Sequence, residues 1–293
     1  MKKIFTLLAG LLIASSSFAI PAMAIWRTVK QADGTLLKVM TVGDEHFNYA
    51  MTEDGIPLVP YHGNYYYAHI VDQQLVASSV LAHNKDLRHG REELAAAALE
   101  EVRQLQRNKE QQVSSKPFGL SDGTTWEGSK KGLVILVEFS DKSFTNPQNV
   151  LTLRPLYEKM LNEEGYKNDN GAIGSVHDYF KDQSNGRFDL TFDVIGPVKL
   201  AHPYKYYGER TQNMNDANAP QMIIDACKAV KEQVDWRRYD WDGDGEVEQV
   251  YVIYAGEGEA TGDDADTVWP HKYSLTDAGL SALHFNGQTI DIY

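Results

Sequence analysis

The residues of this chain best suited to chemistry are three aspartates at alternate positions, Asp240, Asp242 and Asp244, followed directly by a glycine. Their carboxylate oxygens can converge on one hard cation, and the glycine permits the sharp turn that such a loop needs. An EF-hand carries a bidentate Glu at its twelfth position, whereas this chain has Tyr251 there and the apolar run 249–255 around it. The pattern therefore predicts a calcium loop that leads into a strand, with a structural and not a catalytic role.

The coordination shell of this predicted calcium site needs further oxygens beyond the three aspartates. Glu248, at the ninth position of the loop, is the candidate closing ligand, and Glu246 can supply its backbone carbonyl. The alternative is an Asp- and Gly-rich turn that binds no metal. We keep both interpretations open at this point.

The rest of the chain shows no pattern typical of a hydrolytic or nucleotide-binding centre. None of the nine histidines has the H-E-x-x-H spacing that places two zinc ligands and a general base on one helix. G-x-S-x-G and P-loop motifs are missing as well. The single cysteine, Cys227, lies in an apolar helical stretch and is interpreted as a buried core thiol. His271 follows an acidic loop and fits either a metal neighbour or a simple turn residue. We assign no catalytic residue.

The amino terminus indicates export. Lys2 and Lys3 precede an apolar stretch over 4–13, which is too short to span a membrane. We expect signal-peptide cleavage after Ala19, with Ala24 as the alternative, and a secreted or periplasmic chain without a membrane span. The chain has 28 basic and 41 acidic side chains and a formal net charge of −13, which argues against nucleic acid as a partner. Its oligomeric state is left open.

The hydrophobic patterns divide the exported chain into a β-rich first part and an α+β second part. Residues 20–110 are predicted as a prodomain-like segment, with a β-meander over 26–82 and a helix over 84–112. Residues 111–131 are predicted as an exposed linker. The second domain, 132–293, is predicted to hold strands at 133–139, 188–194 and 249–255, helices at 150–164, 173–184 and 216–233, and a hairpin turn at Asn286–Gly287.

Four segments together resemble one family: 132–141, 174–189 with its Gly-Ser-Val-x-Asp-Tyr-Phe start, 239–256 with the aspartate loop, and Trp-Pro-His at 269–271. In this order they look like the start of the catalytic domain in the immune inhibitor A family of secreted bacterial zinc metalloendopeptidases. The resemblance covers about residues 130–290. It implies a thermolysin-like zincin fold, a zinc ion held by H-E-x-x-H and a downstream ligand, a cleaved prodomain, bound calcium, and protein or peptide substrates.

The chain departs from this family in one respect that matters for mechanism, because it ends at Tyr293 without the H-E-x-x-H helix. We therefore expect an N-terminal fragment of a zinc metalloendopeptidase that is inactive as given. Two alternatives remain. One is a secreted calcium-dependent binding module that uses the Tyr-rich sheet or the acidic loop 257–266, and the other is a prodomain-like inhibitor. An in-frame H-E-x-x-H in the coding sequence past codon 293 would favour the peptidase.

Overall fold

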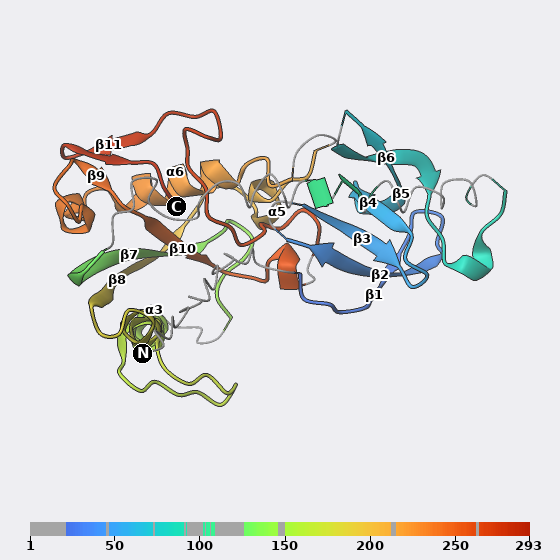
Figure 1. Ribbon diagram of the computed structural model, residues 1–293. Helices are drawn as coiled ribbons and strands as arrows, with labels where there is room; N and C mark the ends of the chain where they lie inside the picture. Colours follow the sequence, from blue (N-terminus) through green and yellow to red (C-terminus); the bar gives the residue numbers. More distant parts are fainter. Residues whose placement is uncertain are drawn as a thin grey trace, which may run out of the picture.

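The computed structural model describes residues 22–44, 47–72, 74–90, 126–145, 150–211, 215–261 and 264–293, with residues 92, 102, 104, 105, 107 and 108. A β-meander and an α/β part lie side by side (Figure 1). The described residues combine sheets with a few helices, in agreement with the α+β prediction. Among them, no helix has both the length and the apolar character needed to cross a membrane.

The first part is a six-stranded antiparallel sheet whose strands follow one another in chain order. Its core is made of side chains that alternate along the strands, including Leu37, Val39, Leu58 and Tyr67, all of which are fully buried. This confirms the meander predicted from the alternating pattern. The strands are β1 (Arg27–Lys30), β2 (Leu36–Gly43), β3 (Asn48–Thr52), β4 (Pro57–Tyr61), β5 (Asn64–Val71) and β6 (Gln74–Leu81).

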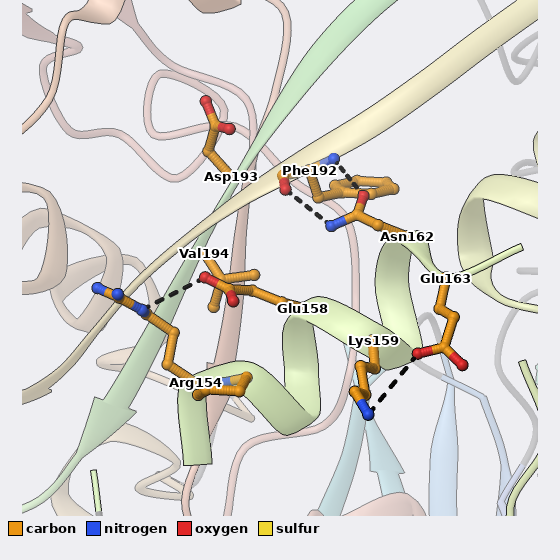
Figure 2. A pocket seen from close by; sticks show the side chains of 9 residues that line it. Arg154, Glu158, Lys159, Asn162, Glu163, Phe192, Asp193 and Val194 are labelled. Atoms are coloured by element: carbon orange, nitrogen blue, oxygen red, sulfur yellow. Dashed lines mark hydrogen bonds and ion pairs between the residues drawn. The ribbon is translucent and has the colours of Figure 1, made fainter. Parts of the chain in front are cut away.

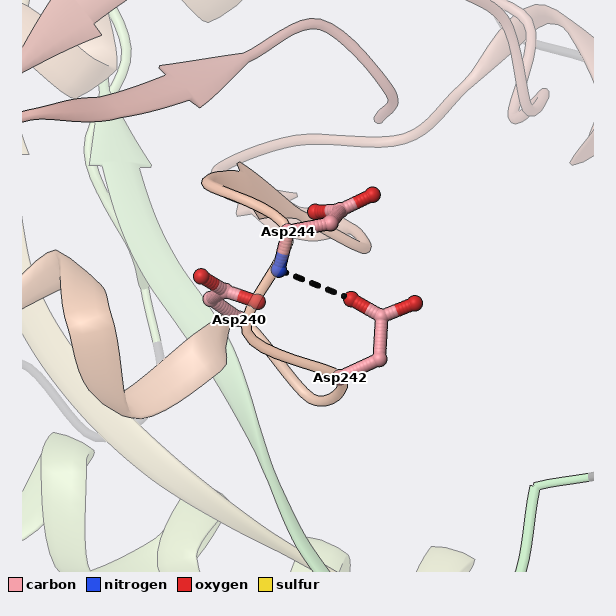
Figure 3. A group of neighbouring side chains, drawn as sticks. All are labelled: Asp240, Asp242 and Asp244. Carbon is pink, nitrogen blue, oxygen red and sulfur yellow. Dashed lines mark hydrogen bonds between the residues drawn. The ribbon is translucent and has the colours of Figure 1, made fainter.

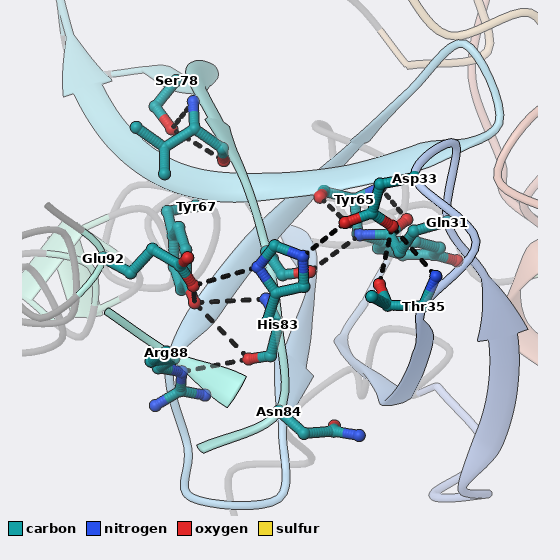
Figure 4. Close-up of polar contacts among 12 residues, drawn as sticks. Gln31, Asp33, Thr35, Tyr65, Tyr67, Ser78, His83, Asn84, Arg88 and Glu92 are labelled. Carbon is teal, nitrogen blue, oxygen red and sulfur yellow. Dashed lines mark hydrogen bonds and ion pairs between the residues drawn. The ribbon is translucent and has the colours of Figure 1, made fainter. Parts of the chain in front are cut away.

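A polar network beside this core joins the end of β6 to the β1–β2 turn (Figure 4). His83 lies at its centre, with Nε2 2.7 Å from Asp33 Oδ2 and Nδ1 3.1 Å from Glu92 Oε2. Glu92 also accepts a hydrogen bond from the hydroxyl of the buried Tyr67 at 2.9 Å. Burial lowers the pKa of His83, but the hydrogen bonds to Asp33 and Glu92 outweigh this effect and raise it above its usual value.

The second part is built on a three-stranded parallel sheet in which β7 (Gly128–Glu138) lies between β10 (Val250–Tyr254) and β8 (Phe188–Lys199). Leu133, Ile135 and Val137 point to one face and Val134 and Leu136 to the other, and all five are buried. The continuous apolar run, predicted as a strand over 133–139, thus belongs to a central strand that is covered on both faces.

Helices cover the two faces of this sheet (Figure 1). On one side α3 (Val150–Asn162) and α4 (Val176–Gln183) pack against β8, and on the other α6 (Ala219–Val230) packs against the opposite face of β7. Cys227 is part of the α6 core and is fully buried, and its burial raises the pKa of the thiol to about 12. The predicted role as a core thiol is confirmed.

A helix cap and the predicted hairpin turn are each made by a few neighbouring residues. Ser175 caps α4, because its side chain accepts a hydrogen bond from Asp178 N while the Asp178 carboxylate accepts one from Ser175 N. Asn286 and Gly287 have φ angles of 52° and 86° and connect β11 (Leu283–Phe285) to β12 (Gln288–Ile290). Strand β12 then pairs in parallel with β9 (Glu246–Val247).

Two predicted boundaries were wrong. The linker was placed over 111–131, but β7 already begins at Gly128, where 128–131 pair with 188–191 of β8. No sign of a strand is visible in the sequence here, because its first residues include two lysines, are exposed or half-buried, and show no apolar alternation. The helix was predicted from residue 84, yet Lys85–Leu87 form a single 3-10 turn, η1. Most of that predicted helix, and the linker up to 125, lie outside the described residues.

The network around His83 predicts a pH dependence for the first part. A raised folded-state pKa stabilises the fold fully below the unfolded value of about 6.5, and this contribution is lost as the pH rises through the folded pKa. We expect the thermal midpoint to fall between about pH 6 and pH 9, and His83→Gln to make that fall smaller. His69→Gln, an exposed histidine on β5, is the control and should leave the slope unchanged. An equal slope in His83→Gln and the parent chain would contradict the account.

Candidate metal site

The three aspartates of the predicted calcium loop come together in the structure (Figure 3). One carboxylate oxygen from each of Asp240, Asp242 and Asp244 lies within 4.8 Å of the others. In the described ranges this is the only group of three or more His, Cys, Asp or Glu donors that close together. Asp240 is half-buried and the other two are exposed, so the oxygens lie at an accessible surface.

Backbone amides of the loop hold the aspartates in place. The two oxygens of Asp240 accept hydrogen bonds from Gly243 N at 2.7 Å and Gly245 N at 3.0 Å. Asp242 Oδ1 accepts one from Asp244 N at 3.2 Å. Gly243 and Gly245 have φ angles of 81° and 93°, in the left-handed region that favours glycine, so the aspartates are brought together by a turn that these glycines make possible.

Glu248 does not join this group, although we expected it to close the shell. Its two carboxylate oxygens each lie 2.8 Å from the backbone N–H of Trp241, so the side chain closes the base of the loop. Burial raises the pKa of Glu248 to about 7, and the nearby carboxylates of Asp242 and Asp240 act in the same direction. The position of Glu248 is therefore explained by its hydrogen bonds to Trp241 without a cation. Its role as a calcium ligand stays a prediction.

Trp241 attaches the loop to the central strand of the sheet. Its indole N–H donates to the backbone oxygen of Lys131 at 2.7 Å, and its own backbone oxygen accepts from Lys130 Nζ at 2.5 Å. The indole ring also meets Trp126 and Phe188, with centroid separations of 5.3 Å and 5.6 Å. The aspartates are consequently held in a fixed position relative to β7.

The chemistry open to this arrangement is cation binding. Three carboxylates at such short range repel one another, by about 1 kcal/mol per pair at 4 Å in water and more at lower dielectric. A divalent cation replaces this repulsion with attraction, and carboxylate oxygens are the ligands that calcium prefers. The loop presents no nucleophile or general base beside a pocket, so its geometry argues for stabilisation of the fold.

The described histidines of the second part do not form a zinc site. His177 Nε2 lies 2.6 Å from Asp189 Oδ1, and His202 stacks on Tyr206. His271 Nδ1 lies 2.6 Å from Trp269 O, and His284 Nδ1 lies 3.2 Å from the Thr289 hydroxyl. Each has its own local partner, and none belongs to a group of three donors. A catalytic zinc ion requires three protein ligands and one open position, which these residues do not provide.

A groove lies between α3 and β8 on the same part of the molecule (Figure 2). The Asn162 amide reaches across it to β8, where it donates to Phe192 O at 3.0 Å and accepts from Phe192 N at 2.7 Å. The exposed side of α3 carries the ion pairs Arg154–Glu158 and Lys159–Glu163. Asn162 thereby satisfies backbone groups of the edge strand β8. These polar residues around the groove thus pair with one another or with the backbone, and we assign no ligand to it.

A comparison with protein families matches residues 120–287 to the model described as the immune inhibitor A peptidase M6, catalytic domain. The match covers more than half of the chain. This chain belongs to the immune inhibitor A peptidase family. The matched residues include the whole parallel sheet and the aspartate loop, whereas the β1–β6 sheet precedes them. A search of curated proteins found no match.

Membership of the M6 family places the chain among metallopeptidases and implies a metal cofactor and protein substrates. The aspartate loop, the capped helix α4 and the apolar strand β7, on which the resemblance was based, all lie within the matched residues. Sequence reasoning missed the anchoring role of Trp241 and the buried pair Arg210–Glu259, whose side-chain atoms lie 2.7 Å apart. A tryptophan inside an otherwise polar loop was the available signal for the first, and no local pattern indicated the second.

Proposed function

We propose that this chain serves extracellular proteolysis as the prodomain-like and leading catalytic-domain part of a zinc metalloendopeptidase. The observation that carries the proposal is the family match over 120–287, which coincides with a sheet covered by helices on both faces. The signal-like amino terminus supports export. The β1–β6 sheet takes the prodomain-like role in this proposal, and a thermolysin-like arrangement is its expected fold relationship.

Calcium is the structural cofactor in this proposal. Its support is the convergence of Asp240, Asp242 and Asp244 within 4.8 Å on a loop that Trp241 ties to β7. A bound ion would hold the loop closed and so stabilise the contact between the loop and the sheet. Because the residues described do not fit a zinc centre, we derive no hydrolytic step from them.

One prediction of this proposal concerns activity. We expect the purified 293-residue chain to show no zinc-dependent hydrolysis of casein or a quenched peptide, because its sequence has no H-E-x-x-H and its described histidines lie apart. Assays run with added zinc and with chelator, beside a zinc endopeptidase of known activity, measure this. Chelator-sensitive hydrolysis that His271→Ala abolishes would contradict the expectation and would identify a site that the described residues do not reveal.

The coding sequence past codon 293 separates the peptidase proposal from its main alternative. An in-frame H-E-x-x-H there supports the endopeptidase. A reading frame without this motif would count against it and favour a calcium-dependent binding module, because the chain would then keep the aspartate loop and lack a hydrolytic centre.

Another prediction of this proposal concerns calcium. At a hundredfold excess over the dissociation constant, a bound ion should stabilise the chain by about 2.7 kcal/mol, which corresponds to roughly 5 to 10 °C in thermal midpoint. Asp242→Asn keeps the size of the side chain and removes a charge, so most of this shift should be lost. Asp169→Asn, in an exposed loop, is the matched control and should behave like the parent. Equal midpoints in calcium and in chelator would overturn the assignment.

A further inference from the structure

The end of the first sheet touches the family domain at one well-defined place. Strand β2 ends at Gly43, and Asn48, the first residue of β3, is 6 % exposed although it is polar. Asn48 Oδ1 accepts a hydrogen bond from Arg210 Nη2 at 3.0 Å and lies 3.3 Å from Asn215 Nδ2. The partners are 162 and 167 positions away in the chain. This contact therefore joins the two parts of the molecule directly.

Arg210 is buried where it makes this contact, with only 7 % of its side chain exposed. The same Nη2 lies 2.7 Å from Glu259 Oε1, and the Glu259 side chain is 4 % exposed. A buried charge is costly unless it is paired and hydrogen-bonded. Glu259 supplies the opposite charge, and the amide oxygen of Asn48 supplies a further acceptor from the other part of the molecule.

Contacts with residues 266 and 267 hold the backbone at and near Arg210. Arg210 N donates to Asp266 Oδ1 at 3.2 Å. Two residues earlier, a Cβ atom on Gly208 would lie 2.3 Å from the backbone carbon of Thr267. The backbone at Gly208 is therefore in direct contact with the backbone at Thr267. On the other side, Asn48 Nδ2 donates to Asp44 O at 3.1 Å, which holds its amide oxygen toward Arg210. Each residue of the pair thus also has a hydrogen bond within its own part of the molecule.

Main-chain hydrogen bonds extend the same junction. Met23 N donates to Ala260 O at 2.6 Å, next to Glu259, and Ala22 N donates to Gly43 O at 2.8 Å. The segment before β1 consequently links Gly43, at the end of β2, to η4 (Glu259–Thr261). Backbone hydrogen bonds and a buried ion pair therefore lie at the same contact between the two parts.

We infer that the β1–β6 sheet docks on the family domain through Asn48, Arg210 and Glu259, and that it stays bound after the segment joining the two parts is cut. The partner of this surface on the family domain is the β2–β3 end of the sheet in the same chain. The inference concerns how the two parts hold together and does not depend on peptide hydrolysis or on calcium.

The test uses the full chain with a recognition sequence for a site-specific protease placed within 109–125. After cutting, the two pieces should elute together in size-exclusion chromatography across a dilution series. Asn48→Ala should raise the dissociation constant of the cut pair by roughly tenfold or more, because it removes an acceptor from a buried charged donor. Pieces of the parent that separate on the first column would overturn the inference.

Two further variants make the result specific. Asn84→Ala is the matched control, because both side-chain hydrogen bonds of Asn84 stay inside the sheet, with Lys38 N and Leu36 O. Its cut pair should dissociate as the parent does. Arg210→Lys keeps the charge opposite Glu259 but loses the guanidinium geometry, and in this background Asn48→Ala should have a smaller effect. Equal effects of Asn48→Ala and Asn84→Ala, or full additivity with Arg210→Lys, would refute the assignment. Circular dichroism of the uncut variants confirms that each is folded.

Discussion

The burial of β7 on both faces is the constraint on which the rest of the family domain depends. Leu133, Ile135 and Val137 require an apolar partner on one side, and Val134 and Leu136 require one on the other. The sheet around β7 is parallel and needs cover on each face, which α6 and the pair α3–α4 provide. The side chains of this one strand thus contribute to the apolar clusters on both sides of the sheet.

The aspartate loop draws its rigidity from this strand. Trp241 donates to the backbone of β7 and packs against Phe188 of β8, so the carboxylates are held relative to the sheet. The loop also leads through β9 into the small sheet that β11 and β12 complete. A cation at the loop would consequently stabilise contacts among segments that are distant in sequence.

Local chemistry made much of the fold predictable. The apolar run of β7, the Ser175 cap and the Asn286–Gly287 turn each act over a few residues, so the sequence displays them directly. Interactions between distant segments left no such pattern. Asn48 and Arg210 are 162 positions apart and each is an ordinary surface residue type, so their buried contact could not be predicted. The same holds for Glu248, whose carboxylate is taken up by the backbone of Trp241.

The central claim is that the family domain is one folded unit organised around β7, and hydrogen exchange tests it most directly. In the full chain, the amides of 133–137 should exchange among the slowest of residues 126–293, because opening them requires both helical layers to separate. Amides in the exposed loop 168–172 should exchange early. Exchange of 133–137 as fast as that of 168–172 would contradict the claim, since it would mean that the two helical layers do not protect the strand.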